Sequence, residues 1–224
     1  MRKSRKQHKN ERRRIVPITA KTLNQKEYIR DIVENDVIFC TGPSGSGKSY
    51  IAAGIAANHI YRDEVDQIIV TRPLVCAGQD IGSLPGELDE KIKPYLLPME
   101  ENLKHFLGRD YYGKLFNDGR IRYEPLEVMR GATFHEAYMI LDEAQNCTLS
   151  QIKMFITRMG ENSKVLINGD IRQTDIKKFS GLLECVDRLE GIEGVGVSRL
   201  YYEDIQRNGI IGRVLEALEE DYYD

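Results

Sequence analysis

The sequence predicts a three-layered α/β domain, in which a mostly parallel sheet is covered by helices on both faces. Three observations lead to this fold class. Short apolar segments alternate along the chain with longer segments of helical periodicity. The short segments are continuously apolar, which is typical of strands buried on both faces. The chain has 224 residues with 41% hydrophobic content, enough for one domain with a substantial core.

The first elements along the chain are the clearest. The segment Thr22-Leu23-Asn24-Gln25 has the form of a capping box that opens a helix, and Asn35 is expected to end it. A strand at residues 37–41, a helix at about 48–61 and a second strand at 67–71 follow. The apolar face of the first helix is expected to hold Leu23, Ile29, Ile32 and Val33.

The middle of the chain, from residue 73 to about 135, is less regular, and prolines are expected to break it into short helices. These prolines are Pro73, Pro85, Pro94, Pro98 and Pro125. Regular alternation then returns. The elements expected there are a strand at 137–141, a helix capped by Thr148-x-x-Gln151, a strand at 164–168, a helix at 180–189, a strand at 195–200 and a helix at about 210–220.

A glycine-rich segment separates the first strand from the helix that follows it. It matches G-x-x-x-x-G-K-[ST], the pattern of a loop whose backbone N–H groups surround a phosphate chain at a helix N-terminus. Lys48 supplies a positive charge for the β- and γ-phosphates, and the Ser49 hydroxyl can ligate Mg²⁺. The predicted nucleotide-binding residues here are Gly42, Pro43, Ser44, Gly45, Ser46, Gly47, Lys48, Ser49 and Tyr50.

Two acidic residues follow the strand at 137–141, at the kind of position where an α/β sheet binds its ligands. Asp142 is predicted to hold Mg²⁺ together with Ser49, and Glu143 is predicted to orient and polarise the attacking water. A glutamate in this role argues against a small-molecule kinase, in which an acceptor replaces the water. The loop and the acid pair together predict a P-loop, RecA-like core that binds ATP and Mg²⁺ and hydrolyses ATP.

A third polar segment, Asn168 to Gln173, follows the strand at 164–168. Gln173 could reach the γ-phosphate or its attacking water and report hydrolysis to the rest of the protein. A turn rich in Gly and Asp is an equally good interpretation. The residues alone do not decide between these two roles.

Several short motifs, in a fixed order, resemble those of the PhoH-like ATPase family. The motifs are Thr71-Arg72-Pro73, Gly82-x-Leu84-Pro85-Gly86, Asp142-Glu143-Ala144-Gln145-Asn146 and Gly169-Asp170-x-x-Gln173. The resemblance runs from about Thr22 to Glu216, nearly the whole folded chain. The family is similar to the first motor domain of superfamily 1 helicases and is linked to RNA metabolism. The resemblance therefore implies an ATPase coupled to RNA or single-stranded nucleic acid.

The resemblance also adds candidate site residues. Gln25 becomes a candidate for recognition of adenine, a role that can coexist with its capping role. Further candidates, for contact with nucleic acid or phosphate, are Thr71, Arg72 and Arg130.

Arg207 stands where the family carries a late arginine, but Asn208-Gly209 follows it here where His-Pro is expected. Arg207 is the first candidate for a catalytic arginine finger, ahead of Arg213 and Arg172. Its alternative role is a surface arginine paired with Glu203 or Asp204.

The net charge of −3 hides an uneven distribution. Residues 1–14 hold eight Lys or Arg and one acid, which leaves residues 15–224 with 24 of the 32 basic and 34 of the 35 acidic residues. We expect a flexible basic arm at 1–14 and a single P-loop ATPase domain at 15–224. The arm indicates an anionic partner such as nucleic acid, although a solubilising tail is the alternative.

Other features limit the location and the assembly. No segment is apolar enough to span a membrane or act as a signal peptide, and the spacing of the cysteines fits no zinc or redox motif, so we expect a cytoplasmic protein. A single motor core leaves one side of its nucleotide uncovered. We therefore expect a homo-oligomer, for example a hexameric ring.

Two other functions are compatible with the same core. One is an ATP-dependent switch or assembly factor that acts on a protein partner without nucleic acid. The other is an inactive nucleotide-binding module, against which the presence of both Glu143 and Ser49 argues.

Overall fold

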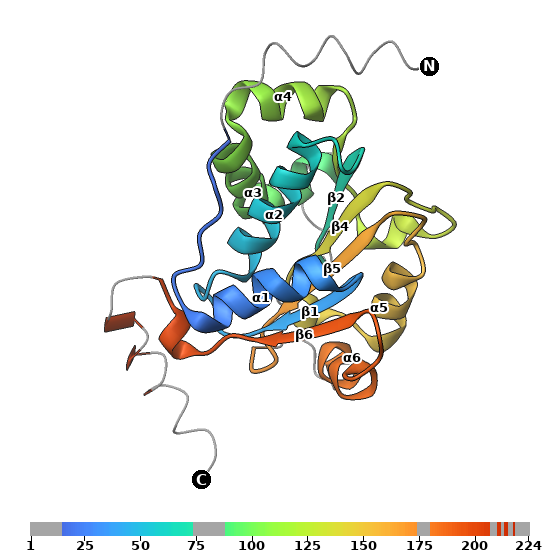
Figure 1. Ribbon diagram of the computed structural model, residues 1–224. Coiled ribbons are helices and arrows are strands. Elements are labelled where there is room, and N and C mark those ends of the chain that lie inside the picture. Colours follow the sequence, from blue (N-terminus) through green and yellow to red (C-terminus); the bar gives the residue numbers. More distant parts are fainter. Residues whose placement is uncertain are drawn as a thin grey trace.

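Six parallel strands form one sheet in the order β3-β2-β4-β5-β1-β6 (Figure 1). The computed structural model describes residues 15–73, 88–173 and 180–206, with a few further residues between 210 and 217. The strands are Val37–Thr41 (β1), Gln67–Thr71 (β2), Ile121–Tyr123 (β3), Ala137–Leu141 (β4), Lys164–Gly169 (β5) and Val195–Arg199 (β6).

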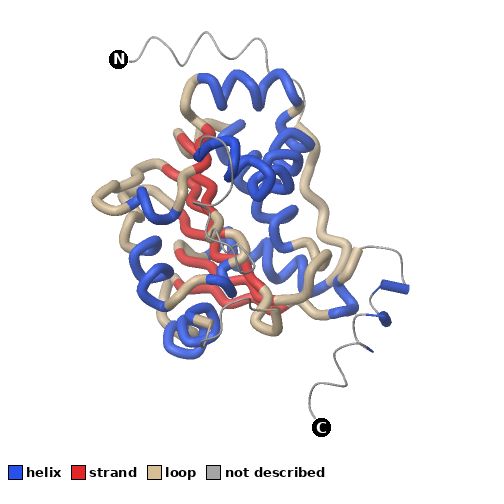
Figure 2. Tube along the Cα trace, turned by 180° about the vertical axis from the view of Figure 1, so that it is seen from behind, coloured by secondary structure: helices blue, strands red, loops and turns tan. Residues whose placement is uncertain are grey.

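Helices cover both faces of this sheet (Figures 1 and 2). One face carries α1 (Leu23–Glu34), α2 (Lys48–Tyr61), α3 (Leu88–Leu107) and α4 (Arg109–Asn117). The other carries α5 (Leu149–Ile156), α6 (Gly181–Leu189) and the 3₁₀ helix η3 (Leu126–Met129). Two more 3₁₀ helices are η4 (Ala144–Asn146) and η5 (Tyr202–Asp204). The predicted three-layered α/β fold class is confirmed.

The apolar strand sequences follow from this layering. Successive side chains of a strand point to opposite faces of the sheet. In β1, Ile38 and Cys40 join the core beneath α1 and α2, whereas Phe39 joins the core beneath α5 and α6. Both faces are buried, so apolar residues occupy most positions of both alternating sets.

The buried face of α1 differs from the predicted one. Thr22 caps the helix and Asn35 ends it, as expected, but Leu23 is 78% exposed and Val33 is 59% exposed. The buried residues are Gln25, Tyr28 and Ile32. The prediction was right for Ile32 and for Ile29, which packs partly buried against the core, and wrong for Leu23 and Val33. It assigned the face by hydrophobicity alone, whereas two of the buried side chains, Gln25 and Tyr28, have polar ends that hydrogen-bond inside the protein.

The prediction of short helices between prolines was also wrong for residues 88–107. The helix α3 runs through Pro94 and Pro98 without a break. Proline removes a helical hydrogen bond, but tertiary packing overrides this cost. Met99, Leu103 and Phe106 are buried in the core shared with α2. Neither α4 nor β3 was predicted from the sequence, while Pro85 and most of the expected helix at 210–220 lie outside the described residues.

The order of the strands brings the polar segments together. The strand β5 lies between β4 and β1, and Thr41 of β1 pairs in register with Gly169 of β5. Since the strands are parallel, the segments that follow β1, β4 and β5 emerge at the same edge of the sheet. Within the described residues, none of the helices is long and apolar enough to cross a membrane.

Candidate functional site

The loop between β1 and α2 has a backbone that requires glycine. Gly42, Gly45 and Gly47 have positive φ angles of 153°, 84° and 101°. A Cβ at Gly42 would also lie 2.5 Å from the carbonyl oxygen of Leu200. The glycines of the sequence pattern therefore meet both a conformational and a steric need.

Contacts from distant segments hold this loop in place. The Ser46 hydroxyl donates to the Pro43 carbonyl at 2.8 Å, and Nε2 of Gln25 on α1 donates to the Ser46 carbonyl at 2.9 Å. The backbone N–H of Gln206, beyond β6, donates to the Gly45 carbonyl at 3.1 Å. The loop is thus fixed by α1 and by the segment after β6.

Lys48 folds back over the loop. Its Nζ atom donates to the carbonyl oxygens of Gly42 at 2.5 Å and of Pro43 at 3.0 Å. These acceptors are neutral, so phosphate oxygens carrying full negative charge would compete well for the ammonium group.

Ser49 and Asp142 meet directly. The Ser49 hydroxyl donates to Oδ1 of Asp142 at 2.8 Å, and Asp142 is only 7% exposed. Burial raises the pKa of the Asp142 carboxyl, and Glu143 raises it further, while Ser49, Arg72 and Lys48 oppose the rise. A hydroxyl and a carboxylate suit Mg²⁺, which prefers oxygen ligands and keeps water and substrate phosphates as its others.

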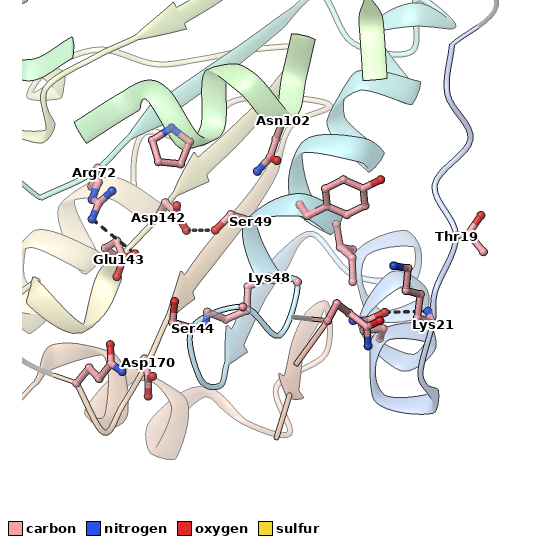
Figure 3. Close-up of a pocket in the computed structure, with 18 of the residues that line it drawn as sticks. Thr19, Lys21, Ser44, Lys48, Ser49, Arg72, Asn102, Asp142, Glu143 and Asp170 are labelled. Atoms are coloured by element: carbon pink, nitrogen blue, oxygen red, sulfur yellow. Dashed lines mark hydrogen bonds and ion pairs between the residues drawn. The ribbon is translucent and has the colours of Figure 1, made fainter. Parts of the chain in front are cut away.

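Glu143 has an unusual backbone and a restrained side chain. Its φ angle of 57° is left-handed, and it immediately precedes η4. Oε1 lies 3.6 Å from Nη2 of Arg72, and Oε2 accepts a hydrogen bond from Nε2 of Gln145 at 2.6 Å. The carboxylate lies in the same pocket as Ser49, Lys48 and Asp142 (Figure 3).

The segment after β5 forms a turn. Oδ1 of Asp170 accepts from the backbone N–H of Arg172 at 3.1 Å, and the Asp170 carbonyl accepts from the N–H of Gln173 at 3.1 Å. Gln173 lines the pocket, whereas the Arg172 guanidinium lies 5.2 Å from the ring centroid of Tyr202. The segment is therefore a turn, as one interpretation expected, and it also places Gln173 at the pocket, as the other required.

These segments enclose a pocket of about 750 Å³, within the range of small-molecule sites. Most of the predicted site residues line it: Gln25, Ser44, Gly45, Gly47, Lys48, Ser49, Tyr50, Asp142, Glu143 and Gln173. Gly42, Pro43 and Ser46 shape the loop but do not line the pocket. Arg207 lies outside the described residues, and Arg213 is exposed.

Gln25 combines a structural role with a place in the pocket. Its backbone N–H donates to the Thr22 hydroxyl at 3.2 Å, which is one half of the predicted capping box. The other half is displaced, because Oε1 of Gln25 accepts from the N–H of Lys21 at 2.8 Å. For the Gln25 amide to hydrogen-bond to adenine, it would have to give up its present bonds to Ser46 and Lys21. Of the residues proposed for contact with nucleic acid or phosphate, Thr71 is buried, and Arg130 is exposed and does not line the pocket.

Part of the pocket wall was not predicted from the sequence. The additional lining residues include Pro17, Thr19, Lys21, Pro98, Asn102 and Gln206. Figure 3 shows Asn102 pointing from α3 toward Ser49 and Asp142. These residues reach the pocket through long-range packing, so no local motif could have identified them.

The parallel sheet, the glycine loop after β1 and the acid pair after β4 define a P-loop protein of the nucleoside triphosphatase class. Residues 17–219 match the family described as PhoH-like protein, and the chain belongs to this family.

Several curated relatives carry the same description. The chain is 42% identical over 205 residues to the PhoH-like protein of Bacillus subtilis (strain 168), covering 91% of this chain and 64% of the relative. It is 41% identical over 204 residues to the PhoH-like protein of Synechocystis sp., covering 90% and 62%. It is 42% identical over 205 residues to Protein PhoH of Escherichia coli (strain K12). That match covers 90% of this chain and 58% of the relative. The chain thus spans about three fifths of these relatives.

Solved structures show a weaker likeness. The large terminase from a thermophilic bacteriophage, in complex with ADP, has a TM-score of 0.49 at 12% identity, covering 91% of this chain and 50% of the terminase. The Pif1 helicase from Candida albicans has a TM-score of 0.45 at 18% identity, covering 91% and 44%.

Proposed function

We propose that this chain binds ATP with Mg²⁺ and hydrolyses the ATP in a cycle coupled to RNA or single-stranded nucleic acid. The observation that carries the proposal is the meeting of Lys48, the Ser49–Asp142 pair and Glu143 in one pocket beneath a glycine loop. The proposal assigns residues 15–224 to a single ATPase domain that acts in the cytoplasm as a homo-oligomer, and residues 1–14 to a basic arm.

Each residue then has a defined task. The loop N–H groups and Lys48 bind the phosphates, and Ser49 and Asp142 hold Mg²⁺. Held by Ser49 and Asp142, Mg²⁺ would supply positive charge that offsets the negative charge developing in phosphoryl transfer. Glu143 orients the attacking water and accepts its proton. Gln173 senses the γ-phosphate from the turn after β5.

Membership in the PhoH-like family and the position of Arg72 support the coupling to nucleic acid. Arg72 lines the pocket, pairs with Glu143 and is partly exposed. A strand phosphate that attracted this guanidinium would therefore act next to the proposed catalytic carboxylate.

The decisive measurement is the ATPase rate with and without RNA, single-stranded DNA and double-stranded DNA over a salt series. We expect a single strand to raise the rate, and the stimulation to fall as salt rises, because binding to phosphates releases counterions. Stimulation by none of the three would contradict the coupling but not the hydrolysis.

Deleting residues 1–14 should weaken binding to single strands and flatten its salt dependence, because the segment holds eight Lys or Arg residues. Three contacts would contribute a slope of about −2 in log K against log salt concentration. The basal ATPase rate should stay the same, since this segment precedes every motif of the site. An unchanged slope after deletion would make the segment a solubility tail.

One observation favours a second function, an ATP-dependent switch acting on a protein. Residues 15–224 hold 24 of the 32 basic residues and 34 of the 35 acidic ones. This acidic body would repel nucleic acid at long range. ATP hydrolysis without stimulation by any of the three nucleic acids would support the switch.

A further inference from the structure

Gln145 is a buried side chain to which the proposed reaction gives no task, and it joins two of the loops that form the site. It lies in η4 and is 3% exposed. Its Nε2 atom donates to Oε2 of Glu143 at 2.6 Å, and its Oε1 atom accepts from the backbone N–H of Asp170 at 3.0 Å. The segment after β4 is thereby linked to the segment after β5.

The surrounding backbone leaves this side chain little freedom. A Cβ at Gly169 would lie 2.9 Å from both the backbone nitrogen and Oε1 of Gln145, so a glycine at the end of β5 allows the close approach. The backbone of η4 is fixed as well, because the N–H of Asn146 donates to the Glu143 carbonyl at 3.1 Å. Because both the backbone and the side-chain amide of Gln145 are restrained, this amide can fix the orientation of the group to which it hydrogen-bonds.

That partner is the carboxylate of Glu143, whose side chain is 38% exposed. An exposed glutamate normally samples several rotamers, and fixing one of them has an entropic cost. Here each carboxylate oxygen has its own partner, with Arg72 near Oε1 and Gln145 bonded to Oε2.

We propose that Gln145 is a positioning residue: it holds the Glu143 carboxylate in the orientation that receives the proton of the attacking water, and it ties this orientation to the turn from Asp170 to Gln173. The inference rests on the proposed ATP hydrolysis. The link to the turn follows from the backbone, because the Asp170 N–H bonds to Gln145 and the Asp170 carbonyl accepts from the N–H of Gln173.

Two substitutions distinguish the hydrogen bond from Gln145 to Glu143 from the hydrogen bond that Gln145 accepts from Asp170. Gln145→Glu keeps an oxygen that can accept from the Asp170 N–H, but it replaces the donor with an oxygen that repels the Glu143 carboxylate. Gln145→Met has a similar length and loses both bonds. We expect both variants to bind ATP as the wild type does, with kcat lower by about 10- to 100-fold, the scale of a misplaced catalytic group.

Gln151→Glu is the matched control. Gln151 forms the capping box of α5, in which its Oε1 accepts from the Thr148 N–H at 2.9 Å. Glutamate serves equally well at this position of a capping box. We expect this variant to keep wild-type kcat, KM and melting temperature. If Gln145→Met fails to fold, Gln145→Glu remains the decisive variant, since it retains the bond to Asp170.

A double variant distinguishes positioning from general structural support. If Gln145 acts through Glu143, adding Gln145→Glu to Glu143→Gln should lower the single-turnover rate no further, because the two changes are not additive. A further loss in the double variant, or wild-type kcat in Gln145→Glu, overturns the inference alone. A wild-type chain that does not hydrolyse ATP overturns the proposed function and this inference with it.

Discussion

Within the described part of the chain, the Lys48 ammonium group hydrogen-bonds only to carbonyl oxygens of its own loop. These are the carbonyls of Gly42 and Pro43. Its charge is therefore available to a phosphate chain. Lys48→Ala should weaken ATP binding by about 10- to 100-fold, the value of a charged hydrogen bond in a site of this kind. Equilibrium binding of a fluorescent ATP analogue measures the effect. Lys153→Ala, an exposed lysine on α5, is the control, and equal affinity for both variants would contradict the role given to Lys48.

Glu143 is the residue on which hydrolysis, as opposed to binding, is expected to depend. Glu143→Gln keeps the shape of the side chain but removes the proton acceptor, so kcat should fall by about 10²- to 10⁴-fold. ATP affinity should stay close to that of the wild type, because Glu143 lies outside the phosphate loop. Single-turnover hydrolysis and a binding titration, performed on the same preparation, separate the two effects. Normal turnover would remove Glu143 from the proposed mechanism.

The residues of the site differ in how far the sequence could predict them. The glycine loop and the Asp142–Glu143 pair lie in short contiguous segments whose chemistry requires their order, and the structure brings them together as expected. Asn102 and Gln206 could not be predicted, because only the packing of α3 and of the segment after β6 brings them to the pocket. Gln145 lay inside a recognised motif, but its two hydrogen bonds are visible only in three dimensions.

At the scale of elements, two helical glycines should respond in opposite ways to the same change. Gly54 lies in α2, where a Cβ would be 2.8 Å from Cζ of Phe106 and 2.9 Å from Cδ1 of Ile18. Gly113 lies in α4, where a Cβ would meet nothing within 4 Å. Gly54→Ala should lower the free energy of unfolding by about 1–3 kcal/mol through overpacking. Gly113→Ala should raise it by about 0.5–1 kcal/mol, because alanine favours a helix.

Chemical denaturation of the two variants tests this pair directly. If Gly54→Ala is as stable as the wild type, α3 must shift on α2 with little cost. That outcome would contradict the close packing that sets the position of Asn102 in the pocket wall.

The elements also show where local sequence patterns were sufficient. The strands β1, β2 and β4 and the helix α2 begin and end at the predicted residues, because glycine turns and apolar runs mark them clearly. The helix α3 was not predicted, since its stability comes from burial against α2 and not from its own proline-containing sequence.

At the scale of the whole molecule, the strand order could not be predicted from the sequence. The pairing of β1 with β5 and of β2 with β4 joins segments far apart in the chain, and local periodicity contains no information about such partners. The same long-range order also sets the site, because it places the segment after β5 between the phosphate loop and the acid pair. The parallel fold class was predictable, whereas the neighbour of each strand was not.

We expect a second copy of the chain to complete the ATP site. The transition state of phosphoryl transfer develops charge, and an arginine finger from the same or a neighbouring subunit commonly accelerates it by about 10³- to 10⁵-fold. Among the described residues that line the pocket, Arg72 is the one arginine, and it pairs with Glu143. We therefore expect a head-to-tail oligomer, with Arg207 as the first candidate for a finger from the neighbouring subunit.

Mixing two inactive variants tests this expectation. In a mixture of Glu143→Gln and Arg207→Ala, some interfaces pair an intact Glu143 with an intact Arg207 from the neighbour, so part of the ATPase activity should return. Each variant alone, at the same total concentration, is the control. A finger acting within one chain predicts no recovery, because each subunit then lacks one of the two residues. A monomer by light scattering at full ATPase rate, with ATP and nucleic acid present, would contradict the assembly itself.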